Sequence, residues 1–89
     1  MNSRVTEEFV ALFAKLPARV QSQARKNYRL WRDNPSHPGL HFKPLEGLDD
    51  IYSVRVGRGW RAVGLIENGT MNWFWIGSHA DYDKLISQL

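Results

Sequence analysis

Two arginines and one histidine in the second half of the chain have side chains that could act together on a phosphate. Arg55 and Arg61 flank the segment Gly57-Arg58-Gly59, which is typical of a turn between two strands. A three-residue turn places the two arginines directly opposite each other on one face of the sheet, whereas a two-residue turn places them on opposite faces. Two opposed guanidinium groups repel each other unless an anion lies between them. The three-residue turn therefore predicts an anion site.

His79 follows the last expected strand and begins the last expected helix, for which Ser78 is the cap. The Asn68-Gly69 pair predicts a two-residue hairpin in which Arg61 pairs with Ile76, three residues before His79. His79 should then emerge near Arg61. Imidazole exchanges protons near neutral pH, and arginine neutralises developing negative charge. This combination suits phosphodiester chemistry better than hydrolysis by two carboxylates.

Lys43, Tyr82 and His41 complete the candidate set. Lys43 and His41 lie on a short expected strand, and Tyr82 begins the apolar stripe of the last helix. Simpler interpretations stay open, because Tyr82 could be a core residue and His79 or His41 a surface residue. No two histidines have the spacing of a zinc pair, and the chain has no cysteine, so we expect no metal site and no thiol nucleophile.

The elements that must position these residues follow from periodicity. Thr6 can cap a first helix that Pro17 ends, and a second helix runs from Pro17 to about Asp33, forming a hairpin with the first. The apolar residues of the first helix recur at i, i+3, i+4 and i+7, and they are Phe9, Leu12, Phe13 and Leu16. Those of the second helix form its inner line, and they are Val20, Ala24, Tyr28 and Trp31.

The period then changes to two, which predicts four strands: Leu40–Lys43, Ile51–Val56, Trp60–Glu67 and Met71–Gly77. Pro44 and a turn over Glu46–Asp50 should close the first of them. Pairing through the hairpin places Gly64 opposite Trp73 and Ala62 opposite Trp75. The expected fold is α+β, with an N-terminal helical hairpin on a curved, mostly antiparallel four-stranded sheet and a short C-terminal helix. The face toward the helical hairpin should carry Trp60, Ala62, Gly64, Ile66, Met71, Trp73 and Trp75. The opposite face should carry Arg61, Val63, Leu65, Phe74 and Ile76.

Length and composition set the outer limits. The 89 residues make one domain, 1–89, and 43% hydrophobic residues can fill its core. The net charge of +3 permits a polyanionic partner without requiring one. No apolar run reaches the roughly 20 residues of a membrane span, and the N-terminus does not resemble a signal peptide. We therefore expect a cytoplasmic protein with no membrane partner.

Four stretches match a known family in order and spacing along almost the whole chain: Leu16-Pro17 with Val20-Gln21; Asn34-Pro35 with His37-Pro38 and Leu40-His41-Phe42-Lys43; Tyr52-Ser53-Val54-Arg55-Val56-Gly57 with Trp60-Arg61-Ala62; and Trp75-Ile76-Gly77-Ser78-His79-Ala80-Asp81-Tyr82-Asp83. In these stretches the chain resembles the RelE/ParE superfamily of type II toxin–antitoxin toxins. The resemblance implies helices packed on a curved antiparallel sheet whose other face is concave.

The resemblance also implies an activity. RelE-like members are endoribonucleases that need no metal or cofactor and cut mRNA, usually on the ribosome, by attack of the ribose 2′-hydroxyl on the adjacent phosphorus. By position, Arg61 would stabilise the transition state and His79 would act as general acid or base, and Arg55, the third residue of the catalytic set, would hold a backbone phosphate. Lys43 would hold a backbone phosphate, Tyr82 would stack on or orient a base, and His41 would join the substrate-binding set.

The chain departs from the family pattern at three places, one of which is that it lacks the distal C-terminal tyrosine of some members, and other functions stay open. Only Met1 to Val5 is available for the usual first strand, which should be very short or absent, and Ser53 stands where some members carry a cation. The implied partners are a cognate antitoxin that covers the sheet and its basic rim, mRNA and the ribosome. The alternatives are a ParE-like toxin that poisons DNA gyrase, and an inactive member that only binds RNA or protein.

Overall fold

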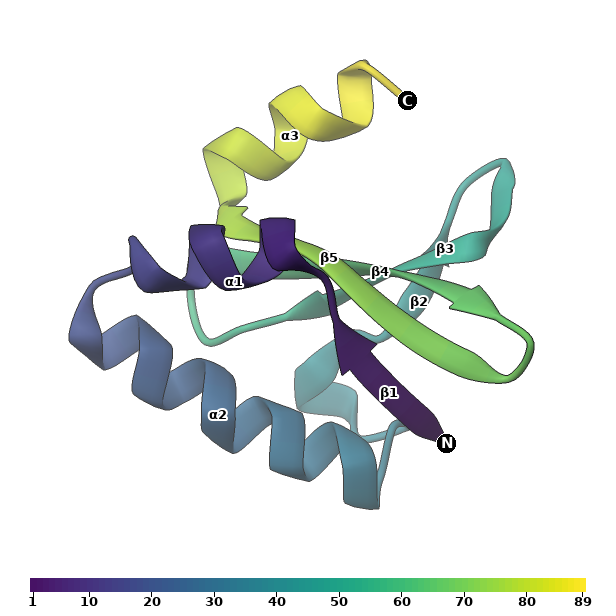
Figure 1. Ribbon diagram of the computed structural model, residues 1–89, viewed down its shortest axis with the longest axis horizontal. Helices are drawn as coiled ribbons and strands as arrows, with labels where there is room; N and C mark the ends of the chain where they lie inside the picture. The colour runs from purple at the N-terminus through teal and green to yellow at the C-terminus, as the bar shows by residue number, and fades with distance from the viewer.

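The computed structural model describes all 89 residues and consists of one five-stranded sheet with helices on both faces (Figure 1). The strand order is β1-β5-β4-β3-β2, with β1 parallel to β5 and every other pair antiparallel. The strands are β1 (Asn2–Val5), β2 (Lys43–Leu45), β3 (Leu48–Arg55), β4 (Trp60–Glu67) and β5 (Thr70–Ser78). The helices are α1 (Glu7–Ala14), α2 (Ala18–Asp33), the 3₁₀ turn η1 (Pro38–Leu40) and α3 (His79–Ser87).

The α+β class and the three expected helices are confirmed, but the sheet has five strands and not four, because the Met1 to Val5 segment does form the very short strand that the sequence had left open. The fifth is β1, which pairs along its whole length with β5, Asn2 lying beside Thr70 and Val5 beside Trp73. Three of its four residues are polar, so no alternating pattern marks it in the sequence. A strand of this kind forms because the edge of β5 offers backbone partners, a tertiary effect that local sequence does not report.

Local signals set the helical hairpin. The Thr6 hydroxyl oxygen accepts a hydrogen bond from the Phe9 N–H at 3.1 Å, as expected for the cap of α1. Pro17 precedes α2, and the Gln21 side-chain amide donates to the Phe13 carbonyl at 3.0 Å. That bond ties α2 to the last residues of α1. None of the helices is long and apolar enough to cross a membrane.

The expected strand Leu40–Lys43 was wrong. Pro38 begins the η1 turn, the His37 imidazole accepts from the Gly39 N–H, and Leu40 is fully buried at the end of the turn. His41 then adopts a left-handed conformation with φ 47°, which no strand tolerates. The strand β2 starts only at Lys43 and contains Pro44, which is acceptable because β2 is an edge strand.

The turn that follows β2 is also shorter than expected. Leu45 pairs with Leu48, so the connection is the pair Glu46-Gly47, with Gly47 at φ 79°. As a result β3 begins at Leu48, three residues before the expected start at Ile51.

One extra residue in β5 changes the register near the site. The Asn68-Gly69 turn has both residues at positive φ, and Gly64 lies opposite Trp73, as expected. Beyond that point the register shifts, so that Trp75 lies opposite Val63 and not opposite Ala62. Phe74 is the extra residue of a β-bulge. The expectations that Ala62 faces Trp75 and that Arg61 faces Ile76 were therefore wrong.

The bulge also exchanges two core residues between the faces. Trp73 and Ile76 pack in the cluster under α1 and α2, together with Trp31, Leu40 and Met71. Trp75 moves to the other face, where the second cluster consists of Leu45, Val63 and Tyr82, with Phe74, Trp75 and Leu85 beside them. The expected faces hold for the other residues of these clusters. Figure 1 shows α2 and α3 on opposite sides of the sheet, which matches the two clusters.

Candidate functional site

The candidate residues gather on the α3 side of the sheet, around the turn between β3 and β4. Val56 N–H donates to the Trp60 carbonyl at 2.9 Å across a three-residue turn, with Gly57 at φ 59° and Gly59 at φ 85°. Arg55 consequently lies directly opposite Arg61. This confirms the three-residue alternative and places both guanidinium groups on one face of the sheet.

The hydrogen-bond pattern shows which kind of antiparallel pair the two arginines form. Hydrogen-bonded and non-hydrogen-bonded pairs alternate along antiparallel strands, and Val56 bonds to Trp60. Arg55 and Arg61, one step further in, therefore form a non-hydrogen-bonded pair, in which side chains lie closer together. No carboxylate forms a salt bridge with either guanidinium. A local excess of positive charge on this scale favours a bound anion.

The guanidinium of Arg61 is partly shielded from solvent. Its Nε and Nη1 atoms are buried and have no hydrogen-bond partner. Its guanidinium carbon lies 5.2 Å from the centroid of the Tyr82 ring. Buried polar groups are almost always hydrogen-bonded in folded proteins. The third nitrogen, Nη2, is not shielded and makes no hydrogen bond, so it is the edge of this charged fork at which a phosphate or carboxylate oxygen can be received.

Trp75 and Gly77 shape the strand opposite Arg61. The bulge places Gly77 opposite Arg61, and a Cβ atom on Gly77 would lie 2.8 Å from Cζ2 of Trp75. The Trp75 ring thus covers Gly77 and also contacts Tyr82, with ring centroids 6.3 Å apart. The sequence motif contained this tryptophan, but the bulge that turns it to this face has no sequence signal.

His79 lies at the other side of Tyr82. Its backbone N–H donates to the Gly59 carbonyl at 2.8 Å, which fixes the start of α3 against the β3–β4 turn. Its imidazole meets the Tyr82 ring edge-on, with centroids 5.8 Å apart, and its Nδ1 lies 3.4 Å from a carboxylate oxygen of Asp83. Ser78 caps α3 by accepting from the Asp81 N–H, as expected. His79 and Arg61 thus contact the same ring.

Asp83 was not among the expected site residues. It lies four residues after His79 on the same helix, a spacing that brings side chains together, and this spacing was the signal that could have identified it. It contacts Nδ1 of the imidazole, and Nε2 makes no contact with a carboxylate. The His79 side chain is 54% exposed.

Lys43 lies on the same face, further from the turn. It pairs with Ser53 on β3, two residues before Arg55, so the two positions share a face. A hollow of about 650 Å³ separates α3 from the β2–β3 hairpin, and Lys43 and Tyr82 both line it together with Leu45, Ile86 and Leu89. Lys43 and Tyr82 therefore border the same hollow, and Arg61 and His79 adjoin it through their contacts with the Tyr82 ring.

Tyr82 and His41, two of the expected substrate-binding residues, differ from the other candidates. Tyr82 is buried, and no polar or aromatic contact joins His41 to them. Tyr82 is only 7% exposed, and Arg61, Trp75 and His79 surround its ring, so stacking on a base stays a prediction. His41 is exposed, and no hydrogen bond, salt bridge or aromatic contact joins it to the other candidates. Its role in substrate binding also stays a prediction.

Ser53 stands where some members of the family carry a cation, and its side chain is buried in an unusual way. It is fully buried, and its hydroxyl has no hydrogen-bond partner. It lies between Lys43 and Val63 on the α3 face of the sheet. No three of the His, Asp and Glu side chains lie close enough together to hold a metal ion.

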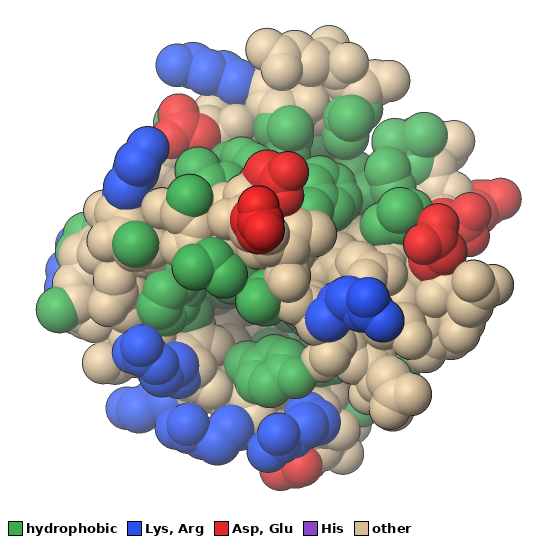
Figure 2. Space-filling view, in the orientation of Figure 1, with side chains coloured by type: hydrophobic (Ala, Val, Ile, Leu, Met, Phe, Trp, Pro, Cys, Tyr) green, Lys and Arg blue, Asp and Glu red, His purple; other side chains and the backbone are tan.

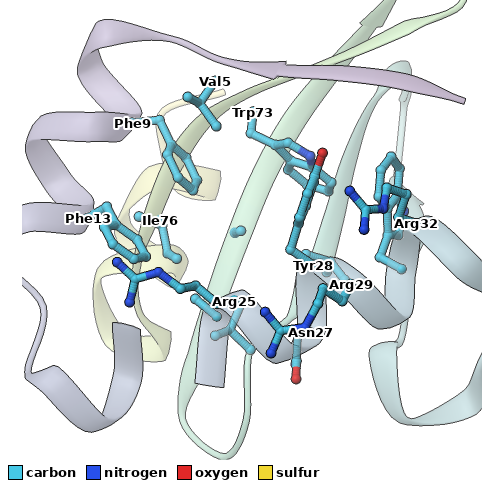
Figure 3. A pocket seen from close by; sticks show the side chains of 15 residues that line it. Val5, Phe9, Phe13, Arg25, Asn27, Tyr28, Arg29, Arg32, Trp73 and Ile76 are labelled. Carbon is cyan, nitrogen blue, oxygen red and sulfur yellow. The ribbon is translucent and has the colours of Figure 1, made fainter. Parts of the chain in front are cut away.

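A second hollow, of about 430 Å³, lies on the opposite side of the sheet between the helices (Figure 3). Its lining is mostly apolar, and its polar residues are Arg25, Asn27, Arg29 and Arg32 of α2, with Tyr28 between them. Arg25 lies over the Phe13 ring and Arg32 over the Tyr28 ring, at 5.0 and 5.6 Å. Figure 2 shows Lys and Arg side chains gathered over α2 along the border of an apolar surface.

Comparison with known proteins places the chain in a family. A sequence model of the ParE-like toxin domain matches residues 18–84, which span α2, the whole antiparallel part of the sheet and most of α3. The chain therefore belongs to the RelE/ParE superfamily of toxins. No curated protein matches the sequence.

Solved structures share the fold. The RelB–RelE complex of Methanococcus jannaschii contains a chain that superimposes with a TM-score of 0.73 at 15% identity, covering 91% of this chain and 95% of that one. For the RelBE2 complex of Mycobacterium tuberculosis the TM-score is 0.69 at 21% identity, with 88% and 96% covered. For isolated RelE of E. coli it is 0.67 at 17% identity, with 99% and 98% covered. Identities this low establish the common fold.

Proposed function

We propose that this chain is a RelE-like endoribonuclease toxin that cleaves mRNA and is neutralised by a cognate antitoxin. The observation that carries the proposal is the state of Arg61, whose two buried nitrogens have no partner and whose guanidinium is held on Tyr82 beside Arg55. The toxin family and the RelE chains among the structural neighbours support the same assignment.

The proposed reaction is a transesterification within the RNA. The ribose 2′-oxygen forms a bond to the adjacent phosphorus, the bond from phosphorus to the 5′-oxygen of the next nucleotide breaks, and the products are a 2′,3′-cyclic phosphate and a 5′-hydroxyl. Negative charge builds on the non-bridging oxygens in the transition state. Arg61, with Arg55 opposite it, would donate to those oxygens and stabilise that charge.

His79 is the candidate for proton transfer. Asp83 contacts Nδ1, so Nε2 would either take the proton from the 2′-hydroxyl while water gives one to the departing 5′-oxygen, or give a proton to the 5′-oxygen while water takes the one from the 2′-hydroxyl. Lys43 would hold a neighbouring backbone phosphate along the concave surface. Tyr82 supports both groups, since it contacts the Arg61 guanidinium and the His79 ring.

The antitoxin assignment rests on the toxin family and on complexes such as those of M. jannaschii and M. tuberculosis, which contain RelB. We propose that part of the antitoxin covers the concave catalytic surface and part fills the apolar hollow between α1 and α2. That hollow presents arginines that no carboxylate of this chain pairs with. An acidic, amphipathic segment would complement it. Such a toxin would act in the cytoplasm, on the ribosome.

The test is direct detection of the cleavage products. The purified chain is incubated with ribosomes programmed with a defined mRNA and, separately, with the free mRNA. Mass spectrometry should show 2′,3′-cyclic phosphate and 5′-hydroxyl ends, and Arg61→Ala should form them at least about a hundredfold more slowly. Arg58→Ala is the matched control, because Arg58 is exposed at the tip of the same turn. DNA breaks that depend on gyrase, without RNA cleavage, would overturn the proposal and select the ParE-like alternative.

A further inference from the structure

A chain of side-chain amides connects α2 to the end of the strand that carries Arg55. The Gln23 amide donates to the Asn27 side-chain oxygen at 2.7 Å, and the Asn27 amide donates to the backbone carbonyl of Arg55 at 2.8 Å. Both side chains are half-buried and lie one turn apart on the same side of the helix. The helix lies on the face of the sheet opposite to the candidate site.

The carbonyl that Asn27 binds has no strand partner. Arg55 is the non-hydrogen-bonded residue beside Val56, so its carbonyl points away from β4 and toward the β2 side of the strand. However, β2 begins at Lys43, which pairs with Ser53, and no residue of β2 reaches Arg55. The Asn27 amide occupies the position that another strand would otherwise fill.

Fixing this carbonyl also fixes the turn that follows it. The Arg55 Nε donates to the Gly57 carbonyl at 3.2 Å, so the guanidinium is bonded to the same turn. Gly57 is pressed against α2, because a Cβ atom there would lie 2.8 Å from Cγ of Gln23. At the far end of the turn, the Gly59 carbonyl accepts from the His79 N–H at 2.8 Å. The turn thus connects the Arg55 backbone to the first residue of α3.

We propose that Asn27 is a positioning residue for the anion site: its hydrogen bond to the Arg55 carbonyl holds the Arg55 guanidinium and, through the Gly57–Gly59 turn, the start of α3 in place. The expected effect of Asn27 on catalysis rests on the proposed nuclease function, whereas its effect on the order of the turn does not. Asn27 does not touch the substrate, because it reaches Arg55 from the other side of the sheet. It orders groups that repel each other, since Arg55 and Arg61 lie side by side without a carboxylate between them.

Three variants separate positioning from general stability. Asn27→Ala removes the donor, and Asn27→Asp keeps the shape of the side chain but turns a carboxylate oxygen toward the Arg55 carbonyl. Gln21→Ala is the matched control, since Gln21 is also a half-buried amide of α2 that donates to a backbone carbonyl, that of Phe13, at 3.0 Å. Thermal unfolding should place the Asn27→Ala and Gln21→Ala variants at similar stability.

Single-turnover and steady-state cleavage of a defined RNA give the functional measurement. We expect both Asn27 variants to lower kcat by about tenfold or more with KM changed less than about threefold, because misplaced groups weaken the transition state more than binding. Gln21→Ala should leave both constants near those of the wild type. Equal kcat in the wild type and both Asn27 variants would overturn the proposal, as would an equal loss in Gln21→Ala.

A second measurement does not depend on cleavage. Amide hydrogen exchange of Val56 and His79 reports the order of the turn, because the Val56 N–H is bonded across the turn to Trp60 and the His79 N–H is bonded to Gly59 within it. We expect exchange at these two amides to be at least about tenfold faster in Asn27→Ala than in Gln21→Ala. Unchanged exchange would overturn the positioning role. If Asn27→Ala exchanges faster but the wild-type protein does not cleave RNA, the positioning role of Asn27 is upheld and the proposed nuclease function is rejected.

Discussion

The Arg61 guanidinium lies over the Tyr82 ring, with its central carbon 5.2 Å from the ring centroid. The arginine comes from the middle of the sheet and the tyrosine from the second turn of α3, so this contact joins the two elements that carry the site. A cation held on an aromatic face keeps its edge free for hydrogen bonds to an anion. The contact therefore orients the guanidinium before any substrate arrives.

Two substitutions of Tyr82 distinguish the role of its ring from the role of its hydroxyl. The hydroxyl makes no hydrogen bond in this structure, so Tyr82→Phe should change the free energy of unfolding by less than about 0.5 kcal/mol and leave cleavage near the wild-type rate. Tyr82→Ala removes a buried ring and should cost about 3 kcal/mol or more, with loss of cleavage. Urea denaturation and an RNA cleavage assay check both. A strong catalytic defect in Tyr82→Phe would show that the hydroxyl acts on the substrate.

Replacing Arg61 tests the anion site itself. Arg61→Ala should reduce cleavage by about a hundredfold to a thousandfold, the usual effect of removing one donor to a developing oxyanion. Arg61→Lys should recover only part of the rate, because an ammonium cannot offer two parallel donors. Neither change should unfold the domain, since the two buried nitrogens make no bond that would be lost. Wild-type toxicity in a folded Arg61→Ala variant would reject the site.

His79 and Asp83 should differ in importance. His79→Ala should lower cleavage by about a hundredfold or more if the imidazole transfers a proton in the transition state. Asp83→Asn should lower it by less than about fivefold, because both side chains of the pair are more than half exposed and such contacts contribute about 1 kcal/mol or less. Rates from single-turnover cleavage decide between them. Equal losses in the two variants would mean that the carboxylate, and not the imidazole alone, is required.

Gly64 is a test of the packing behind the site. A Cβ atom there would lie 2.6 Å from the Met71 sulfur and 2.8 Å from Cε3 of Trp73, in the core under the helices. Gly64→Ala should destabilise the domain by about 1–3 kcal/mol, the usual cost of overpacking. Gly39→Ala is the comparison, because its nearest neighbour is the exposed His37 ring at 3.2 Å. Chemical denaturation of both should show the larger loss for Gly64→Ala.

Much of the fold could be predicted because its signals are local. The Thr6 and Ser78 caps, the Asn68-Gly69 turn and the break at Pro17 depend on residues within a few positions, and the structure confirms them. Signals of the same kind placed Arg55 and Arg61 on either side of one turn. Sequence could not decide whether that turn has two or three residues, because two glycines permit both.

The failures have tertiary causes. The β1 strand pairs with the edge that β5 offers, and the bulge at Phe74 goes together with the packing of Trp75 over Gly77 on the α3 side. That bulge moved the partner of Arg61 from Ile76 to Gly77, yet His79 still lies beside the site, because its N–H is bonded to the Gly59 carbonyl. Asn27 had no sequence signal at all, since 28 positions separate it from Arg55.

The apolar hollow between α1 and α2 yields a prediction about the antitoxin. Arg29 and Arg32 line the hollow on α2, whereas Arg19 and Lys26 lie on the same helix outside it. Reversing Arg29 and Arg32 to Glu should weaken the complex with the antitoxin by at least about tenfold, because opposed like charges at an interface cost binding energy. Reversing Arg19 and Lys26 to Glu changes the net charge equally and should have a much smaller effect.

Isothermal titration with the protein that suppresses toxicity measures this difference. RNA cleavage should survive both double reversals, because the hollow lies on the face of the sheet away from Arg61 and His79. Equal weakening by the two double reversals would mean that only the overall positive charge of α2 attracts the antitoxin. No weakening by either would place the antitoxin elsewhere, and the concave surface around Tyr82 would then be the remaining contact that could silence the toxin.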